Sequence, residues 1–270
     1  MAQTRAMRRL FPFLLLGLSS LACADGPAFH LATCDGDYPR HVQGICTDGK
    51  DALYWSWTDV LVKTDADGRL LKQVPVADHH GDLCYHAGRV YVAVNLGKFN
   101  RPAGEADSWV YVYDGNTLAE LAKHPVPELV HGAGGIAWHD GKFIVVGGLP
   151  AEIEENYLSE YDESFRVRKR PVLASGNTLR GIQTVAHADG AWWFGCYGKP
   201  AELLRADEDF QLTGKWEFNA AVGIAPLDRG RFLIAKNTAV SDGEGKKKRN
   251  KAHLVVARKD EKAGLVIENP

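Results

Sequence analysis

Three histidines of this chain stand just ahead of short apolar runs, where their imidazoles could converge on one site. They are His41, His80 and His131, and Asp82 follows two residues after His80. Imidazole binds zinc, copper and iron, and a neutral imidazole beside a carboxylate can take up a proton. We therefore treat His80, Asp82 and His131 as candidate catalytic residues, and His41, His80 and His131 as a candidate divalent-metal site. The alternative is that the histidines line a hydrated channel and that Asp82 accepts loop N–H groups.

A second set of polar residues could bind a ligand. Arg180 has forked donors that match a carboxylate or a phosphate, although a salt bridge to Asp82 would use the same donors. The predicted ligand-binding residues are polar and lie around the same apolar runs: His41, Gln43, Asn95, Arg180, Gln183, Tyr197 and Lys236. These residue types favour a small polar or anionic ligand.

The apolar runs that would position these residues belong to an internal repeat. One copy, HGAGGIAWHDGKFIVV from His131 to Val146, contains small residues, an apolar strand, a tight Asp-Gly turn and a second strand. Five copies are present, with apolar anchors at Ile45, Leu83, Ile136, Val185 and Ile224. The anchors lie about 40 to 50 residues apart, a spacing typical of the blades of a β-propeller.

The strand pattern predicts an all-β chain. Aromatic and β-branched residues fill the runs, while Gly, Asp and Asn separate them. We expect a five-bladed β-propeller of four-stranded antiparallel blades; the alternative has six blades, the sixth built from the N-terminal run and the tail. The innermost strands are predicted at Gln43–Cys46, Asp82–Tyr85, Gly135–Trp138, Ile182–His187 and Val222–Leu227.

Loop lengths predict which face of the propeller carries the site. The long insertions 95–108, 147–156 and 237–252 all follow a second strand, so they gather on the face where the innermost strands begin. Insertions collected on one face usually mark the binding face of a repeat fold. The opposite face has tight turns, and we interpret His139 and His187 there as structural.

The N-terminus has the pattern of an export leader. Basic Arg5, Arg8 and Arg9 precede an apolar run that is too short to span a bilayer, and Ala22-Cys23-Ala24 resembles a cleavage site. We exclude residues 1–24 from the fold and expect one propeller domain over residues 25–270, secreted or periplasmic. The alternative is lipidation of Cys23, which would anchor the protein to a membrane.

Charge and cysteine usage limit the partners. The net charge of −2 gives no reason to expect binding to nucleic acid. No later segment is apolar enough to span a membrane, and we expect a monomer. Export permits disulfides, so we predict a bridge between Cys34 and Cys46, with Cys84 and Cys196 free and buried.

Several short motifs resemble the five-bladed propellers of the plant and bacterial glutaminyl cyclase family. They are Gln43-Gly44-Ile45 with Leu53-Tyr54, Tyr113-Asp114 with Thr117-Leu118, and Gly223-Ile224-Ala225. The resemblance covers most of residues 41–236 and implies a secreted propeller. The glutamates that the family carries on its inner strands are absent here, so the resemblance does not extend the cyclase activity to this chain.

The sequence leaves two classes of function open. In the first, a polar pocket at the channel mouth serves an enzyme that acts on a small polar substrate such as a sugar or an acid derivative. In the second, the protein is a non-catalytic module that binds a glycan, a peptide or a protein. Convergence of polar groups at the channel mouth favours a small-ligand site in either case.

Overall fold

The computed structural model describes residues 31–241 and 248–268, and every regular element within them is a β-strand. The first seven strands form one continuous sheet: β1 (Gly44–Thr47), β2 (Ala52–Ser56), β3 (Thr58–Asp65), β4 (Leu70–His86), β5 (Arg89–Asn95), β6 (Ser108–Asp114) and β7 (Glu120–Pro125). Strand β4 is long because it serves two units. Its first part pairs with β3 and its second part with β5, so the sheet contains units β1–β4 and β4–β7.

Three further four-stranded sheets follow along the chain. They are β8 (Ala133–His139), β9 (Lys142–Gly147), β11 (Ser159–Tyr161) and β12 (Val167–Lys169); β14 (Leu179–Ala188), β15 (Ala191–Tyr197), β16 (Glu202–Ala206) and β17 (Leu212–Glu217); and β18 (Ile224–Pro226), β19 (Arg231–Ser241), β20 (Lys248–Asp260) and β21 (Gly264–Ile267). A short pair, β10 (Asn156–Tyr157) and β13 (Val172–Leu173), forms a separate two-stranded sheet in the same stretch of chain as the third unit. All strand pairs are antiparallel, and the described strands group into five four-stranded units.

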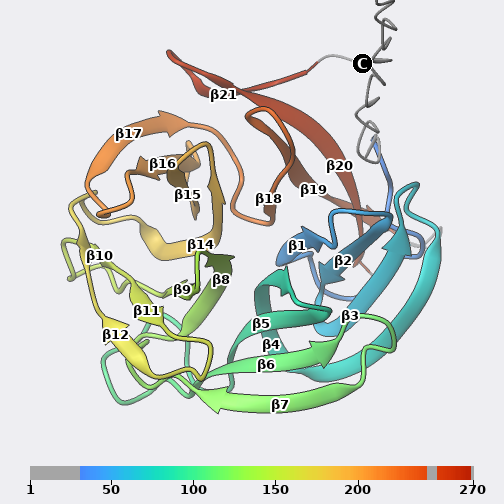
Figure 1. Cartoon of the computed structure of the whole chain (residues 1–270), viewed down its shortest axis with the longest axis horizontal. Coiled ribbons are helices and arrows are strands. Elements are labelled where there is room, and N and C mark those ends of the chain that lie inside the picture. Colours follow the sequence, from blue (N-terminus) through green and yellow to red (C-terminus); the bar gives the residue numbers. More distant parts are fainter. Residues whose placement is uncertain (1–30, 242–247, 269–270) are drawn as a thin grey trace, which may run out of the picture.

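The units stand in a ring, with β1, β8, β14 and β18 toward the centre and β7, β12, β17 and β21 at the periphery (Figure 1). Apolar side chains from neighbouring units form the core between them. Val146 of the third unit and Ile182, Trp192 and Phe194 of the fourth are all fully buried in one such cluster. Burial of these faces drives the units together, because a four-stranded sheet cannot cover its own apolar surface.

The chain closes the ring by pairing its N-terminal segment with the last unit. The Cys34 N–H donates to the Ala252 carbonyl at 2.9 Å, and the Leu254 N–H donates to the Ala32 carbonyl at 2.8 Å. The Asp35 N–H donates to the Gly68 carbonyl in the first unit at 2.9 Å. The described part of the N-terminal segment therefore lies between the first and last units.

The inner strands approach one another closely because glycines stand where they meet. A Cβ at Gly81 would clash with the Gly134 carbonyl, and one at Gly135 would lie 2.8 Å from the Gln183 carbonyl. Strands β4, β8 and β14 are therefore in backbone contact near the centre of the ring. Cavities remain at the two ends of the inner strands.

The predicted disulfide is not formed. Cys34 and Cys46 are both free, and they lie in different core clusters. Cys34 instead packs with the segment that closes the ring, where its Sγ lies 4.0 Å from the Tyr38 hydroxyl. Cys84 and Cys196 are also free. Cys196 is buried as predicted, whereas Cys84 is partly accessible.

Some predictions concern residues outside the described ranges. They are the export leader 1–24, its predicted cleavage pattern Ala22-Cys23-Ala24 and the alternative lipidation of Cys23. The insertion predicted at 237–252 is largely strand, because β19 and β20 extend through Ser241 and from Lys248. Over residues 31–241 and 248–268 no helix has the length and apolarity needed to cross a membrane.

Candidate functional site

A cavity of about 210 Å³ with several polar side chains in its wall opens where the inner strands begin, on the face that carries the insertions. Four units contribute to its wall. The lining residues are His41, Gln43, His79, His80, Gly81, Asn95, Phe99, Ala133, Gly134, Arg180, Gln183 and Tyr197. Seven of the ten predicted site residues are among them, and Asp82, His131 and Lys236 are not. The structure thus brings most of the predicted ligand-binding set together at one channel mouth.

Arg180 is the cationic group of this cavity. Its backbone has a φ of 64°, in the left-handed region that costs energy for a residue with a Cβ, and Gly181 follows with a φ of 75°. The register of β14 against β15 shifts here, so the chain bulges and redirects the Arg180 side chain. Among the described residues the Arg180 guanidinium forms no ion pair, so the alternative role considered for it, a salt bridge with Asp82, is not observed.

His41 and Tyr197 meet across the channel mouth. The His41 Nε2 lies 3.3 Å from the Tyr197 hydroxyl, although the two residues are 156 positions apart in the chain. Burial lowers the pKa of His41, and the nearby positive charges of Arg40 and Arg180 lower it further. Burial also raises the pKa of Tyr197. At neutral pH the cavity therefore holds a neutral imidazole and a neutral phenol beside one guanidinium.

Two glutamine amides add hydrogen-bonding groups to the wall. The Gln183 Nε2 donates to the Arg180 carbonyl at 2.7 Å, which holds the bulge that carries Arg180. The Gln43 Nε2 donates to the Thr58 hydroxyl at 3.1 Å. Each amide nitrogen is thus fixed by the protein. The amide oxygens are the groups that could accept a hydrogen bond from a ligand hydroxyl.

His79 and Phe99 line the cavity although the predicted site omitted them. His79 has a φ of 62°, and its Nδ1 lies 3.1 Å from the Asn95 carbonyl. Phe99 comes from the 95–108 insertion, whose path is held by Asn95: its Nδ2 donates to the Gly97 carbonyl and its Oδ1 accepts the Asp107 N–H. The sequence signal for His79 is its position just ahead of the predicted inner strand Asp82–Tyr85, as Arg180 lies just ahead of Ile182–His187.

His80 does not present its imidazole to the cavity. Its Nδ1 lies 2.8 Å from the Ala77 carbonyl, and its Nε2 lies 2.7 Å from the Tyr113 hydroxyl. Both ring nitrogens are therefore engaged inside the protein, with Tyr111 packed against the ring. Burial lowers the pKa of His80 to about 4. The prediction of a catalytic or metal-binding His80 is corrected accordingly: the side chain is a buried, neutral part of the second unit.

Asp82 lies below the cavity as a buried carboxyl. Its Oδ2 accepts the Val185 N–H, from β14, at 3.1 Å. Burial raises the pKa of Asp82 well above its usual range, although backbone N–H groups partly oppose this. Its Oδ1 has no partner among the described residues and faces Gly44, where a Cβ would clash with it. Asp82 links the second and fourth units, and the prediction of a catalytic base at the channel mouth is corrected.

His131 and Lys236 are also directed away from the cavity. The His131 Nδ1 lies 2.7 Å from the Arg101 carbonyl, and its ring packs edge-on against Tyr157. The Lys236 Nζ donates to the Asn219 carbonyl at 3.0 Å. Burial lowers the pKa of Lys236. His131 thus supports the insertion that covers the site, and Lys236 supports the start of the fifth unit.

The predicted metal site is not assembled from its three histidines. Only His41 presents its ring in the cavity, since His80 and His131 turn toward Tyr113 and Arg101. Among the described residues, the ligand atoms of His41, His80 and His131 do not form a group within metal-ligand distance. A divalent metal held by this trio therefore does not fit the arrangement of the channel mouth.

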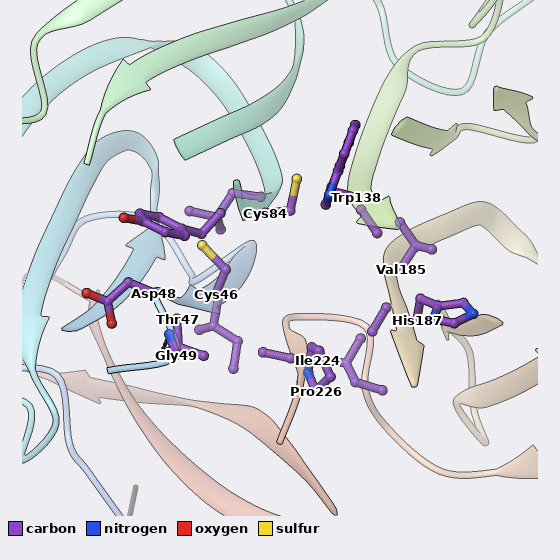
Figure 2. Close-up of a pocket in the computed structure, with 16 residues that line it drawn as sticks. Cys46, Thr47, Asp48, Gly49, Cys84, Trp138, Val185, His187, Ile224 and Pro226 are labelled. Carbon is purple, nitrogen blue, oxygen red and sulfur yellow. Dashed lines mark hydrogen bonds between the residues drawn. The ribbon is translucent and has the colours of Figure 1, made fainter. Parts of the chain in front are cut away.

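A second cavity, of about 310 Å³, lies at the opposite end of the inner strands (Figure 2). Ile45, Leu83, Val185 and Ile224 contribute apolar side chains to its wall from four units. The thiols of Cys46 and Cys84 lie in it (Figure 2). Burial raises the pKa of both thiols well above the ordinary value, so they are protonated and unreactive. The smaller cavity is the better candidate for a ligand site, because it holds the cation and the polar groups.

Comparison with solved structures decides the fold class. The chain resembles the crystal structure of the GH43 BlXynB protein from Bacillus licheniformis with a TM-score of 0.56 and 13% sequence identity. The match covers 90% of this chain and 56% of that chain, so this chain spans little more than half of its neighbour. The chain is a β-propeller. The WD40 β-propeller domain of Doa1 also matches, with a TM-score of 0.44, 11% identity and coverage of 84% of this chain and 77% of that one.

The comparisons support the fold but no particular family. No protein-family model matches the chain, and no curated protein matches its sequence. The propeller expected from the glutaminyl cyclase resemblance is present, whereas nothing in the comparisons points to that family itself. The function of this propeller therefore has to be argued from its cavity.

Proposed function

We propose that the channel mouth of this propeller binds a small hydroxylated ligand that carries a carboxylate, such as a sugar acid or a hydroxy acid. The observation that carries the proposal is the Arg180 guanidinium, which lines the cavity without an ion pair among the described residues. A guanidinium pairs with a carboxylate through two parallel hydrogen bonds. The backbone of Arg180 is strained, because a residue with a Cβ has a positive φ there. Strain of this kind gathers at functional sites, where the surrounding structure enforces it, and this supports a role for Arg180 in function.

The rest of the cavity matches the remainder of such a ligand. The amide oxygens of Gln43 and Gln183 can accept hydrogen bonds from hydroxyl groups, and the His41–Tyr197 pair offers a further polar contact. Phe99 supplies one apolar side. With one cation and no carboxylate among its lining residues, the cavity favours a ligand with a single negative charge.

Binding is favoured over catalysis because the predicted catalytic side chains are engaged elsewhere. His80 and His131 hydrogen-bond to backbone carbonyls, and Asp82 is a buried acid whose pKa is raised by burial. One observation favours a second candidate function, proton transfer to or from the bound ligand. His41 is kept neutral beside Tyr197 within the cavity, which is the state that a general base requires.

Ligand screening with a matched pair of arginine variants tests this proposal. A panel of small monocarboxylates, uncharged sugars and phosphate esters is screened by thermal shift, and hits are measured by calorimetry. Arg180→Ala should weaken carboxylate binding by at least about tenfold, as expected for loss of a charge-assisted pair. Arg40→Ala is the control, since Arg40 lies next to His41 but does not line the cavity. A hit whose affinity is the same in Arg180→Ala and wild type would contradict the proposal.

A further inference from the structure

The turn face of the propeller, opposite the proposed ligand site, carries two histidines and a glutamate in one cluster. His139 ends β8, His187 lies near the end of β14, and Glu208 belongs to the turn between β16 and β17. Among the described residues they are the group whose ligand atoms all lie within 4.8 Å of one another. The third and fourth units both contribute, so the cluster spans the boundary between them.

Glu208 lies against both imidazoles. Its Oε1 is 2.6 Å from the His187 Nε2 and 3.7 Å from the His139 Nε2. The two rings stack with their centroids 3.3 Å apart and an interplanar angle of 15°. The same nitrogen of each ring therefore faces the same carboxylate oxygen. These potential metal-ligand atoms converge on one another, unlike the groups in a linear chain of hydrogen bonds.

Neighbouring structure holds the three side chains in place. The buried Trp192 packs edge-on against both rings, at centroid distances of 4.7 Å from His187 and 5.8 Å from His139. The turn that carries Glu208 is fixed by the Asp207 carboxylate, which accepts the N–H groups of Asp209 and Gln211. Little conformational entropy would therefore be lost if the three side chains closed on an ion.

The cluster offers the kinds of ligand atom that a divalent cation binds. An imidazole in its neutral form has a lone pair for a metal ion, and Glu208 supplies a carboxylate oxygen. The exposed fractions of the Glu208 and His139 side chains, 47% and 35%, leave room for water at further coordination positions.

We propose that His139, His187 and Glu208 bind a divalent transition-metal ion, with Zn²⁺ as the preferred ion. Two imidazole nitrogens and one carboxylate oxygen are ligands that Zn²⁺ commonly takes, with water in the fourth position. Bonds of about 2.0–2.1 Å in tetrahedral geometry place ligand atoms about 3.4 Å apart. The two Oε1–Nε2 separations, 2.6 Å and 3.7 Å, bracket that value. Binding would also require the stacked rings to open, so that both Nε2 lone pairs point at the ion.

A second imidazole stack in the same fold shows what distinguishes this cluster. His86 ends the corresponding strand of the second unit and stacks on Trp138 of the third, with centroids 3.8 Å apart. The stack repeats the contact between adjacent units, but Trp138 provides no metal ligand. In Figure 2 the His187 ring points away from the thiols of Cys46 and Cys84, so the thiols are not part of the cluster.

Metal titration of the purified protein tests the proposal, using a purification tag without histidine. After treatment with a chelator, wild type should bind one equivalent of Co²⁺ with visible absorption typical of low coordination number, and Zn²⁺ should displace it. Zn²⁺ should also raise the Tm, because a ligand that binds only the folded state stabilises it. His139→Ala, His187→Ala and Glu208→Gln should each weaken Co²⁺ binding by at least about tenfold.

Two controls separate the outcomes. His86→Ala removes an equivalent stacked imidazole and should leave both Co²⁺ affinity and the Zn²⁺-dependent rise in Tm unchanged. Glu208→Gln keeps the half-exposed turn intact, so it remains informative if a histidine variant fails to fold. The proposal is overturned if wild type binds no stoichiometric Co²⁺ or if Glu208→Gln binds as tightly as wild type. Strong sulfur-to-cobalt absorption in the near ultraviolet would also overturn it, by placing the ion at the thiols.

Discussion

The hydroxyl of Tyr197 lies 3.3 Å from Nε2 of His41, joining the end of β15 to the segment that leads into β1. The contact reaches from the fourth unit to the first, past the start of the fifth. It closes one side of the cavity that holds Arg180. The channel mouth is therefore built by residues that no single unit contains.

This contact predicts the effect of removing one hydroxyl. Tyr197→Phe should weaken binding of a carboxylate ligand by roughly fivefold, because one neutral hydrogen bond contributes about 1 kcal/mol. The Tm should change little, since Tyr197 is only partly buried. Tyr157→Phe is the control: that hydroxyl accepts the His131 N–H outside the cavity, so ligand affinity should stay at the wild-type value. Calorimetry on the three proteins checks both expectations.

The buried carboxyl of Asp82 predicts how stability depends on pH. Its pKa is raised in the folded state, so the folded protein holds the proton more tightly than the unfolded chain does. The contribution of Asp82 to stability is therefore present at acidic pH and is lost as pH rises above the unfolded value, 3.8. Asp82→Asn is neutral at every pH and should lack this loss. Chemical denaturation between pH 4 and pH 8 should show the difference between the two proteins growing in favour of Asp82→Asn.

Asp82→Ala tests the hydrogen bond by which Asp82 of the second unit accepts the Val185 N–H of the fourth unit. It leaves the buried Val185 N–H without its acceptor, which costs about 1–3 kcal/mol. Asp82→Asn keeps an oxygen for that N–H and should be clearly more stable than Asp82→Ala. Equal unfolding free energies for the two variants would show that the link contributes nothing.

His80 predicts the opposite dependence on pH. Its folded pKa is about 4, below the usual 6.5, because the buried ring resists protonation. Its contribution to stability is full above pH 6.5 and is lost as pH falls toward 4, by up to about 3 kcal/mol. His80→Asn should lower stability at pH 7 yet lose less on acidification. Identical slopes for His80→Asn and wild type would contradict the assignment.

Export processing is a prediction from residues outside the described ranges. We propose cleavage after Ala24, which gives a mature chain Asp25–Pro270, secreted or periplasmic. Intact-mass measurement of the protein recovered from the exported fraction should match that chain. A mass increased by acyl groups on a chain that begins at Cys23 would instead establish the lipid anchor. A mass that matches the uncleaved chain would contradict the prediction of a cleaved export leader.

The sequence determined the strands because their signals are local. Anchors such as Ile136 and Val185 mark inner strands, and two-residue turns such as Asp140-Gly141 need the positive φ angles that the structure gives them. The face that carries the cavity also followed from the sequence, since strand direction alternates and loop length can be counted. For these reasons the sequence predicted Arg180, His41 and Tyr197 at one channel mouth.

Only the tertiary structure decided where each side chain points. The β4–β5 register shifts between His80 and Leu83, and His79 adopts a left-handed backbone there. Because successive residues of a strand face opposite sides, such a bulge reverses the directions that simple alternation predicts. His80 consequently turns toward Tyr113, and Asp82 is buried. The meeting of His139 with Glu208 is likewise tertiary, since 69 positions of chain separate them and only the packing of two units brings them together.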